Sequence, residues 1–196
     1  MFTEPPMNML HARGTGWIEV ITGCMFSGKT EELIRRLNRA LIAKQQVEVF
    51  KPAIDTRYHQ HNVVSHNATS IHATPVPDAQ TILTHAKHCH VVGIDEGQFF
   101  DDQLVVVCNA LANSGKRVIV AGLDMDYEGR PFGAMPNLMA VAEFVTKVHA
   151  ICAQTGGLAT YSHRIVSGGT QIMPGAKDLY EARSRSAFFG NNNTPD

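Results

Sequence analysis

One eight-residue segment constrains this chain more than any other feature. Residues 23–30 read Gly-Cys-Met-Phe-Ser-Gly-Lys-Thr, which matches the phosphate-loop pattern GxxxxGK[ST]. In such a loop the backbone N–H groups surround nucleotide phosphates, the lysine supplies positive charge, and the hydroxyl joins the Mg²⁺ shell. The apolar run Trp17–Ile21 comes directly before the loop, so we expect a strand, the loop and then a helix. A glycine-rich structural turn is the alternative reading.

Short apolar runs alternate with helical patterns along the chain after this loop. Helical spacing of apolar residues predicts a helix that contains Leu33, Ile34, Leu37, Ala40 and Leu41. The further strands that we predict are Val47–Phe50, Val91–Ile94, Val118–Ala121 and Lys147–Ile151, and the further helices are Leu104–Ala112 and Pro136–Val145. This alternation predicts an α/β fold of the P-loop NTPase type, with a mainly parallel sheet flanked by helices.

The chain divides into four parts by its composition and residue pattern. We expect an N-terminal tail over residues 1–15, an ATP-binding domain over 16–151, a lasso or lid over 152–187, and a disordered tail over 188–196. The lasso is rich in Gly, Ser and Thr, and short β-like pieces at Ala159–Val166 and Thr170–Met173 predict a hairpin-rich subdomain. The histidine-rich stretch Asp55–Ser70 has no sustained period and is predicted to be a loop. No internal repeat occurs.

Charge and cysteine usage narrow the function classes. The 196 residues include 17 Lys and Arg against 18 Asp and Glu, so no global positive field attracts nucleic acid or a membrane surface. No apolar stretch approaches the length of a membrane span, and the first residues lack a signal-peptide pattern. The four cysteines form no CxxC pair, as is typical of free thiols in a reducing cytosol. We therefore expect a soluble cytoplasmic protein.

Two adjacent carboxylates supply a second element of phosphoryl-transfer chemistry. The predicted strand Val91–Ile94 delivers Asp95 and Glu96 to the carboxyl edge of the sheet, where open α/β folds bind ligands. Phosphoryl transfer needs a carboxylate that holds the metal and, for a hydroxyl acceptor, a base close by. Asp95 and Glu96 can divide these roles, although an aspartate that caps a turn would give the same pattern.

With these motifs in hand, the chain resembles the type II thymidine kinases, a family that carries a structural zinc lasso in most members. The resemblance spans Trp17–Arg185. It rests on six segments in the right order, namely residues 23–30, Asp55-Thr-Arg57-Tyr, Asp95-Glu-Gly-Gln-Phe-Phe100, Gly122-Leu-Asp124, Arg130-Pro-Phe-Gly133 and Tyr180-Glu-Ala-Arg183.

The resemblance implies transfer of the γ-phosphate of ATP to the 5′-hydroxyl of deoxythymidine, with Mg²⁺ held by Thr30 and Asp95. The catalytic residues that it implies are Glu96 as base, Arg57 and Lys29. A guanidinium such as that of Arg57 can stabilise charge that spreads over the transferring group, although Asp55 and Arg57 could instead be a salt-bridged loop pair. The implied ATP-binding residues are Gly23, Met25, Phe26, Ser27, Gly28, Lys29, Thr30, Asp55, Asp95 and Gln98.

The nucleoside site is also implied by the resemblance. Its matching positions are Met25, Phe99, Leu123, Tyr127, Phe132, Ser162, Ile172, Met173 and Tyr180. A pyrimidine needs apolar faces together with a few fixed donors and acceptors, which this set can supply. Each aromatic or methionine side chain could equally belong to the core.

The chain departs from the family at the zinc ligands. Only Cys152 remains, because the other three positions read Thr155, Ser184 and Ala187. A tetrahedral zinc site needs four ligands, and His163 alone cannot close it, so we expect no structural zinc. Histidines are frequent between His59 and His90, including His88-Cys89-His90, but adjacent residues cannot all face one ion, and we expect no metal site there either.

Two other function classes stay open from the sequence. One is an ATP-binding regulatory module that has lost catalysis, and the other is a phosphate-loop ATPase that couples hydrolysis to motion. Retention of Lys29, Asp95, Glu96 and Arg57 favours the kinase over the first. The family further implies a homotetramer or a dimer with thymidine and ATP as its small-molecule partners.

Overall fold

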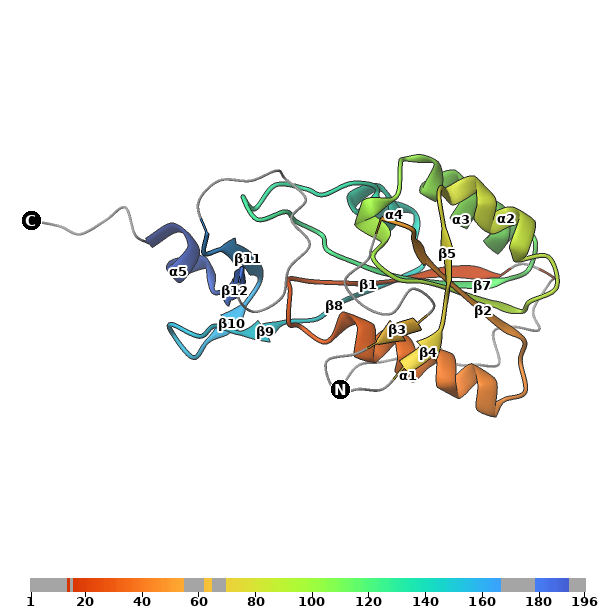
Figure 1. Ribbon diagram of the computed structural model, residues 1–196, viewed down its shortest axis with the longest axis horizontal. Coiled ribbons are helices and arrows are strands. Elements are labelled where there is room, and N and C mark those ends of the chain that lie inside the picture. Colours follow the sequence, from red (N-terminus) through yellow and green to blue (C-terminus); the bar gives the residue numbers. More distant parts are fainter. Residues whose placement is uncertain (1–13, 15, 55–61, 65–69, 167–178, 191–196) are drawn as a thin grey trace, which may run out of the picture.

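A six-stranded sheet forms the centre of the protein (Figure 1). The computed structural model describes residues 14, 16–54, 62–64, 70–166 and 179–190. The strands lie in the order β5-β2-β6-β7-β1-β8, and every pair of neighbours is parallel. Their bounds are β1 Trp17–Thr22, β2 Val47–Pro52, β5 Thr74–Val76, β6 Val91–Ile94, β7 Arg117–Gly122 and β8 Phe144–Lys147.

Helices cover both faces of this sheet (Figure 1). One face carries α1 (Lys29–Ile42), and the other carries α2 (Ala79–His85), α3 (Gln103–Asn113) and α4 (Met135–Val141). Successive strand residues point to opposite faces, so β7 sends Val118 and Val120 to the larger apolar cluster and its other apolar residues to the α1 side. A sheet buried on both faces explains why its strands read as near-continuous apolar runs.

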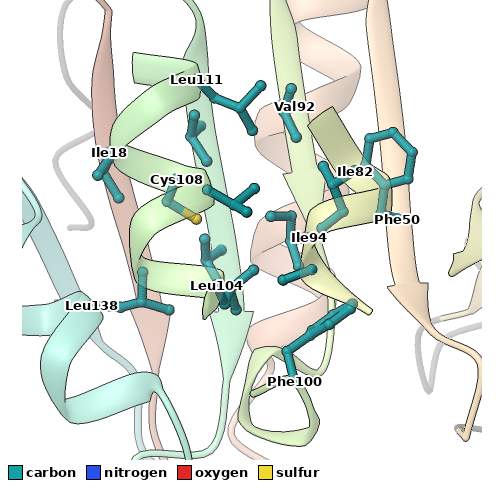
Figure 2. Close-up of a cluster of buried hydrophobic side chains, with 14 of the residues drawn as sticks. Ile18, Phe50, Ile82, Val92, Ile94, Phe100, Leu104, Cys108, Leu111 and Leu138 are labelled. Carbon is teal, nitrogen blue, oxygen red and sulfur yellow. The ribbon is translucent and has the colours of Figure 1, made fainter. Parts of the chain in front are cut away.

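The larger apolar cluster packs α2, α3 and α4 onto the sheet. Figure 2 shows Leu104, Cys108 and Leu111 of α3 lying over side chains of β1 and β6, with Ile82 of α2 beside Phe50 of β2. Leu104 and Cys108 have no exposed surface, and burial raises the pKa of the Cys108 thiol to about 12. Cys108 is therefore a core residue without thiolate chemistry.

Short antiparallel hairpins lie outside the main sheet (Figure 1). One pairs β3 (Asn62–Val64) with β4 (Ser70–His72), the second pairs β9 (Ala150–Ile151) with β10 (Leu158–Ala159), and the third pairs β11 (Tyr161–Arg164) with β12 (Tyr180–Arg183). The helix α5 (Arg185–Phe189) follows β12, and a 3₁₀ turn, η2 (Gly97–Phe99), follows β6. The second and third hairpins lie beside the carboxyl end of β1, next to the phosphate loop.

The fold class and the main strands predicted from the sequence are confirmed. The predicted helix Leu104–Ala112 corresponds to α3, and the predicted strands at Val47, Val91 and Val118 correspond to β2, β6 and β7. The sequence patterns gave no separate prediction for α2, α5 or β5. None of the helices in the described part of the chain has the length and apolar content needed to span a bilayer.

Three boundaries predicted from the sequence are wrong. The helix predicted over Pro136–Val145 ends at Val141, because Phe144–Lys147 pairs with β1 as the strand β8. The strand predicted over Lys147–Ile151 is divided, since β8 ends at Lys147 and Ala150–Ile151 pairs with β10 instead. The predicted loop Asp55–Ser70 contains β3. Strand pairing overrode the local pattern in each case, with the distant strand β1 for β8 and with a neighbouring segment for the other two.

Candidate active site

The phosphate loop connects β1 to α1 and keeps a tight backbone. Gly23 has φ +142°, and a Cβ atom there would lie 2.1 Å from the carbonyl oxygen of Val148, so only glycine fits this close approach. Gly28 forms the left-handed N-cap of α1. The first turn of α1 therefore directs N–H groups that have no partner within the helix, and the positive end of its dipole, at the loop, where phosphates bind.

Lys29 lies at the centre of this loop. Its Nζ donates to the carbonyl oxygen of Cys24 at 2.8 Å, and the Ser27 hydroxyl donates to the same oxygen at 2.7 Å. Burial lowers the pKa of Lys29, whereas the negative charge of Glu96 and, more weakly, those of Asp95 and Asp124 act to raise it. The ammonium therefore sits where added negative charge, such as that of a phosphate, would stabilise it.

The two adjacent carboxylates meet the phosphate loop as expected. Asp95 and Glu96 follow β6, which is separated from β1 only by β7, so all three strands end at the same edge of the sheet. The Thr30 hydroxyl lies 3.4 Å from Asp95 Oδ2, and Asp95 Oδ1 accepts the N–H of Glu96 at 3.0 Å. Mg²⁺ is bound through one or two carboxylates together with substrate phosphates and waters, and Thr30 with Asp95 fits that donor set.

Glu96 and Gln98 form a network at the turn after β6. Glu96 has φ +54°, an unusual left-handed conformation for a residue other than glycine, which is often found at functional sites. Gln98 Nε2 donates to Glu96 Oε2 at 2.5 Å, and Gln98 Oε1 accepts the N–H of Leu123 at 2.9 Å. Leu123 follows β7, so this amide ties together the loops after two neighbouring strands.

An aspartate in the loop after β7 has a place in the site that the sequence did not assign. Asp124 is 6% exposed, its Oδ2 lies 2.5 Å from Lys147 Nζ, and its Oδ1 is buried with no hydrogen-bond partner among the described residues. Its charge reaches both Lys29 and Cys24. The sequence signal was its position two residues after an apolar strand, close to the position that Asp95 has one residue after β6.

The expected nucleoside residues lie in two groups. The Phe99 and Phe132 rings contact edge to face with centroids 5.8 Å apart. Phe99 lies three residues after Glu96, and the N–H of Phe132 donates to the carbonyl oxygen of Asp124 at 3.1 Å. The Tyr127 and Tyr180 rings instead meet through Arg164, whose guanidinium carbon lies 3.6 Å and 5.7 Å from their centroids. Arg164 Nη2 also donates to the Tyr180 hydroxyl at 3.3 Å, a contact that no pattern in the sequence indicated.

Ser162 joins the hairpins to the phosphate loop. It is 4% exposed on β11, and its Oγ accepts the N–H of Met25 at 2.9 Å. Cys24 Sγ makes a second link by donating to the carbonyl oxygen of Ala159 at 3.3 Å. Four expected site residues, Asp55, Arg57, Ile172 and Met173, lie outside the described residues.

The four positions that hold zinc in most type II thymidine kinases lie together here as well. Hydrogen bonds from Thr155 and Ser184 lower the pKa of the Cys152 thiol to about 6. The Thr155 hydroxyl lies 3.2 Å from Ser184 Oγ, which also accepts the N–H of Ala187 at 3.3 Å. Cys152 and Ala187 are both buried in a small apolar cluster.

Metal-ligand clusters are absent from the part of the chain that the structure describes. No group of three or more His, Cys, Asp or Glu side chains lies within reach of one ion there. In the His88-Cys89-His90 segment, Cys89 is buried and donates to the carbonyl oxygen of Ala86, while His90 Nδ1 accepts the N–H of Gln46. These contacts give both side chains structural roles.

Comparison with known proteins agrees with this geometry. A sequence model of the thymidine kinase family matches residues 16–188. The chain is 57% identical over 183 residues to a thymidine kinase of Rhodothermus sp., and the matched region covers 93% of this chain and 86% of that relative. It is 54% identical over 189 residues to a thymidine kinase of Bacteroides thetaiotaomicron, a match that covers 96% of this chain and 94% of that relative. It is 53% identical over 180 residues to a thymidine kinase of Bdellovibrio bacteriovorus, a match that covers 91% of this chain and 87% of that relative. The chain therefore belongs to the thymidine kinase family.

Proposed function

We propose that this protein transfers the γ-phosphate of ATP to the 5′-hydroxyl of thymidine and so produces thymidine monophosphate. The observation that carries the proposal is the meeting of the phosphate loop with two carboxylates, in which Thr30 Oγ1 lies 3.4 Å from Asp95 Oδ2. Membership in the thymidine kinase family supports the same reaction.

The proposed roles follow from the positions of the side chains. The backbone of residues 23–30 and the Lys29 ammonium bind the phosphates of ATP at the N-terminus of α1. Thr30 and Asp95 would hold Mg²⁺, which would neutralise negative charge on the phosphates. Glu96 accepts the proton of the 5′-hydroxyl as that oxygen attacks the γ-phosphorus, with ADP as the leaving group.

The nucleoside is proposed to lie between the turn after β6 and the hairpins that follow β8. Phe99 and Phe132 offer an apolar surface near Glu96, and the Tyr127–Arg164–Tyr180 group offers aromatic and polar surface on the hairpin side. Arg57, Asp55, Ile172 and Met173 keep the roles implied by the family resemblance. The proposed lasso, residues 152–187, would then cover the substrate.

We also propose that the lasso base is held without zinc. The hydrogen-bonded contacts among Cys152, Thr155 and Ser184, and the apolar contact of Ala187, occupy the place where a zinc ion would connect four ligands. Metal analysis of the purified protein tests this. Zinc near one equivalent per chain, with loss of folded protein on chelation, would contradict it.

A cytoplasmic homo-oligomer, either a tetramer or a dimer, is the remaining part of the proposal. Exposed apolar side chains on β8, β9 and β10, namely Val145, Ile151 and Leu158, support association. Sedimentation equilibrium would report the mass directly, and a monomer at micromolar concentration would contradict this part.

The reaction is tested by transfer of labelled γ-phosphate from Mg·ATP to a panel of nucleosides. Thymidine should accept the label, and Glu96→Gln should reduce transfer by about 10²-fold or more while ATP still binds. Hydrolysis of ATP with no labelled nucleoside would favour an ATPase. Binding of ATP by folded protein with neither reaction would favour a regulatory module.

A further inference from the structure

The side chain of Gln98 has both ends of its carboxamide engaged inside the protein. It is 3% exposed, its Oε1 accepts the N–H of Leu123 at 2.9 Å, and its Nε2 donates to Glu96 Oε2 at 2.5 Å. The family resemblance implies a contact between Gln98 and ATP, but a buried amide with these two partners is placed to act on Glu96.

The two contacts can be made in only one orientation of the amide. The backbone N–H of Leu123 is a donor only, so it selects Oε1 as its partner and directs Nε2 at Glu96. An amide N–H cannot accept a hydrogen bond, so Glu96 must present an accepting oxygen to it. Gln98 therefore selects both the position of this carboxylate and an unprotonated oxygen on it.

Tight packing keeps the carboxamide in this place. A Cβ atom added at Gly122 would lie 2.8 Å from Gln98 Oε1 and 2.6 Å from Met135 Sδ, so the glycine leaves the space that the amide fills. Glu96 itself has the left-handed backbone conformation at φ +54°, which is strained for a residue other than glycine and persists only where surrounding contacts hold it. The Gln98 amide contacts the side chain of this residue through Oε2.

We infer that Gln98 is a positioning residue, which holds the Glu96 carboxylate in the orientation that accepts the proton of the attacking hydroxyl. The inference rests on the proposed function, in which Glu96 is the base. A carboxylate on a strained turn has other orientations available, and the Leu123–Gln98–Glu96 chain of hydrogen bonds restricts it to one. Correct placement of a base matters because a misplacement of about 1 Å can cost about 10²-fold in rate.

Two substitutions separate positioning from packing. Gln98→Met keeps the length of the side chain and removes both hydrogen bonds. Gln98→Glu keeps an acceptor for the Leu123 N–H but replaces the donor with a second carboxylate beside Glu96. Gln103→Met, at an exposed position at the start of α3, is the matched control.

We expect Gln98→Met to lower kcat by about tenfold to a hundredfold, with the KM values for ATP and thymidine changed by less than about threefold. Gln98→Glu should lower kcat at least as far at pH 8. Its kcat relative to that of Gln98→Met should rise as the pH falls, because the introduced carboxyl gains a proton that it can donate to Glu96. Gln103→Met should leave all of these values unchanged.

A double-mutant cycle with Glu96→Gln decides the assignment. When the base is already absent, Gln98→Met should reduce the residual rate by less than about twofold, since the two residues act as one unit. If the rate losses of the two single variants multiply in the double variant, the inference is overturned. A raised KM for ATP at unchanged kcat in Gln98→Met would also overturn it, because that result would mark a nucleotide contact. Full transfer by Glu96→Gln alone would instead refute the proposed base, so the two failures are distinguishable.

Discussion

At the scale of single residues, burial and neighbouring charges determine the chemistry of the site. Burial lowers the pKa of Lys29, and three carboxylates in the loops after two strands act in the opposite direction. Asp95 and Glu96 follow β6, and Asp124 follows β7. The carboxylates therefore stabilise the Lys29 ammonium before any phosphate binds. The contribution of Lys29 to ATP binding is the difference between its electrostatic free energy in the free protein and in the ATP complex.

Replacement of Lys29 tests the phosphate loop directly. Lys29→Ala should weaken ATP binding by about tenfold to a hundredfold, because a charged hydrogen bond contributes about 1.5–3 kcal/mol, and phosphoryl transfer should fall as well. Calorimetric titration with Mg·ATP measures the first effect. Lys44→Ala, an exposed lysine after α1, serves as the control. Unchanged affinity and turnover in Lys29→Ala would refute the assignment of the loop.

The thiol of Cys152 predicts a specific pH dependence of stability. Its pKa is lowered from 9.0 to about 6 by hydrogen bonds from Thr155 and Ser184. A group whose pKa is lowered in the folded state stabilises the protein above its unfolded pKa, and this contribution is lost as the pH falls through the folded value. The difference in Tm between the natural protein and Cys152→Ala should therefore increase from pH 6 to pH 9. A constant difference over this range would contradict the shift.

At the scale of elements, the phosphate loop and the hairpins after β8 are joined by direct contacts. Met25 donates to Ser162 on β11, Cys24 donates to Ala159 on β10, and Cys24 packs in the small cluster that contains Cys152. The loop that would bind ATP and the hairpins that would cover thymidine are thus mechanically connected. This connection runs beside the positions that replace the zinc ligands.

Removal of the Ser162 hydroxyl tests this connection. Ser162→Ala leaves the Met25 N–H without its partner, which should reduce the free energy of unfolding by about 1 kcal/mol. The KM for ATP should rise by about fivefold when the same free energy is lost from the ATP-bound state. Ser114→Ala is the control, because Ser114 follows α3 and precedes the amino end of β7, at the opposite edge of the sheet. An equal KM in both variants would show that the contact does not shape the loop.

At the scale of the whole molecule, one buried network of charges joins four elements. Glu19 of β1 has no exposed surface and accepts from Arg117 at 2.6 Å, from Arg36 at 2.8 Å and from Trp17 Nε1 at 2.7 Å. Arg36 lies on α1 and also donates to Thr146 of β8 at 3.0 Å. Strand β1, its neighbours β7 and β8, and the helix α1 are therefore joined by one buried network.

Neutralisation of Glu19 should destabilise the entire fold. Glu19→Gln leaves two buried guanidinium groups without their shared carboxylate, and breaking a buried pair in this way costs about 3–5 kcal/mol. Urea unfolding followed by circular dichroism should show this loss. Glu48→Gln, an exposed glutamate on β2, should change stability by less than about 0.5 kcal/mol. A similar result for both variants would contradict the importance of the network.

The fold class and the main motifs of the candidate site follow from local patterns in the amino-acid sequence. The phosphate loop, Asp95 and Glu96 were found from local patterns, because a strand that ends in a glycine-rich turn or in a carboxylate is recognisable from a few adjacent residues. Parallel strands then bring those ends to one edge without further information. The order of these motifs along the chain was enough to indicate the family.

Contacts between residues far apart in the sequence could not be predicted in this way, because they depend on how the elements are arranged in space. The change from α4 to β8 at Glu143 depends on pairing with β1, more than a hundred residues earlier, and no local pattern contains that partner. The same is true of the Asp124–Lys147 pair, of the contact of Arg164 with Tyr127, and of the amide of Gln98 between Glu96 and Leu123. The spacing of apolar residues along the sequence indicates which face of an element is buried. The contacts named here depend instead on how separate elements are placed in space.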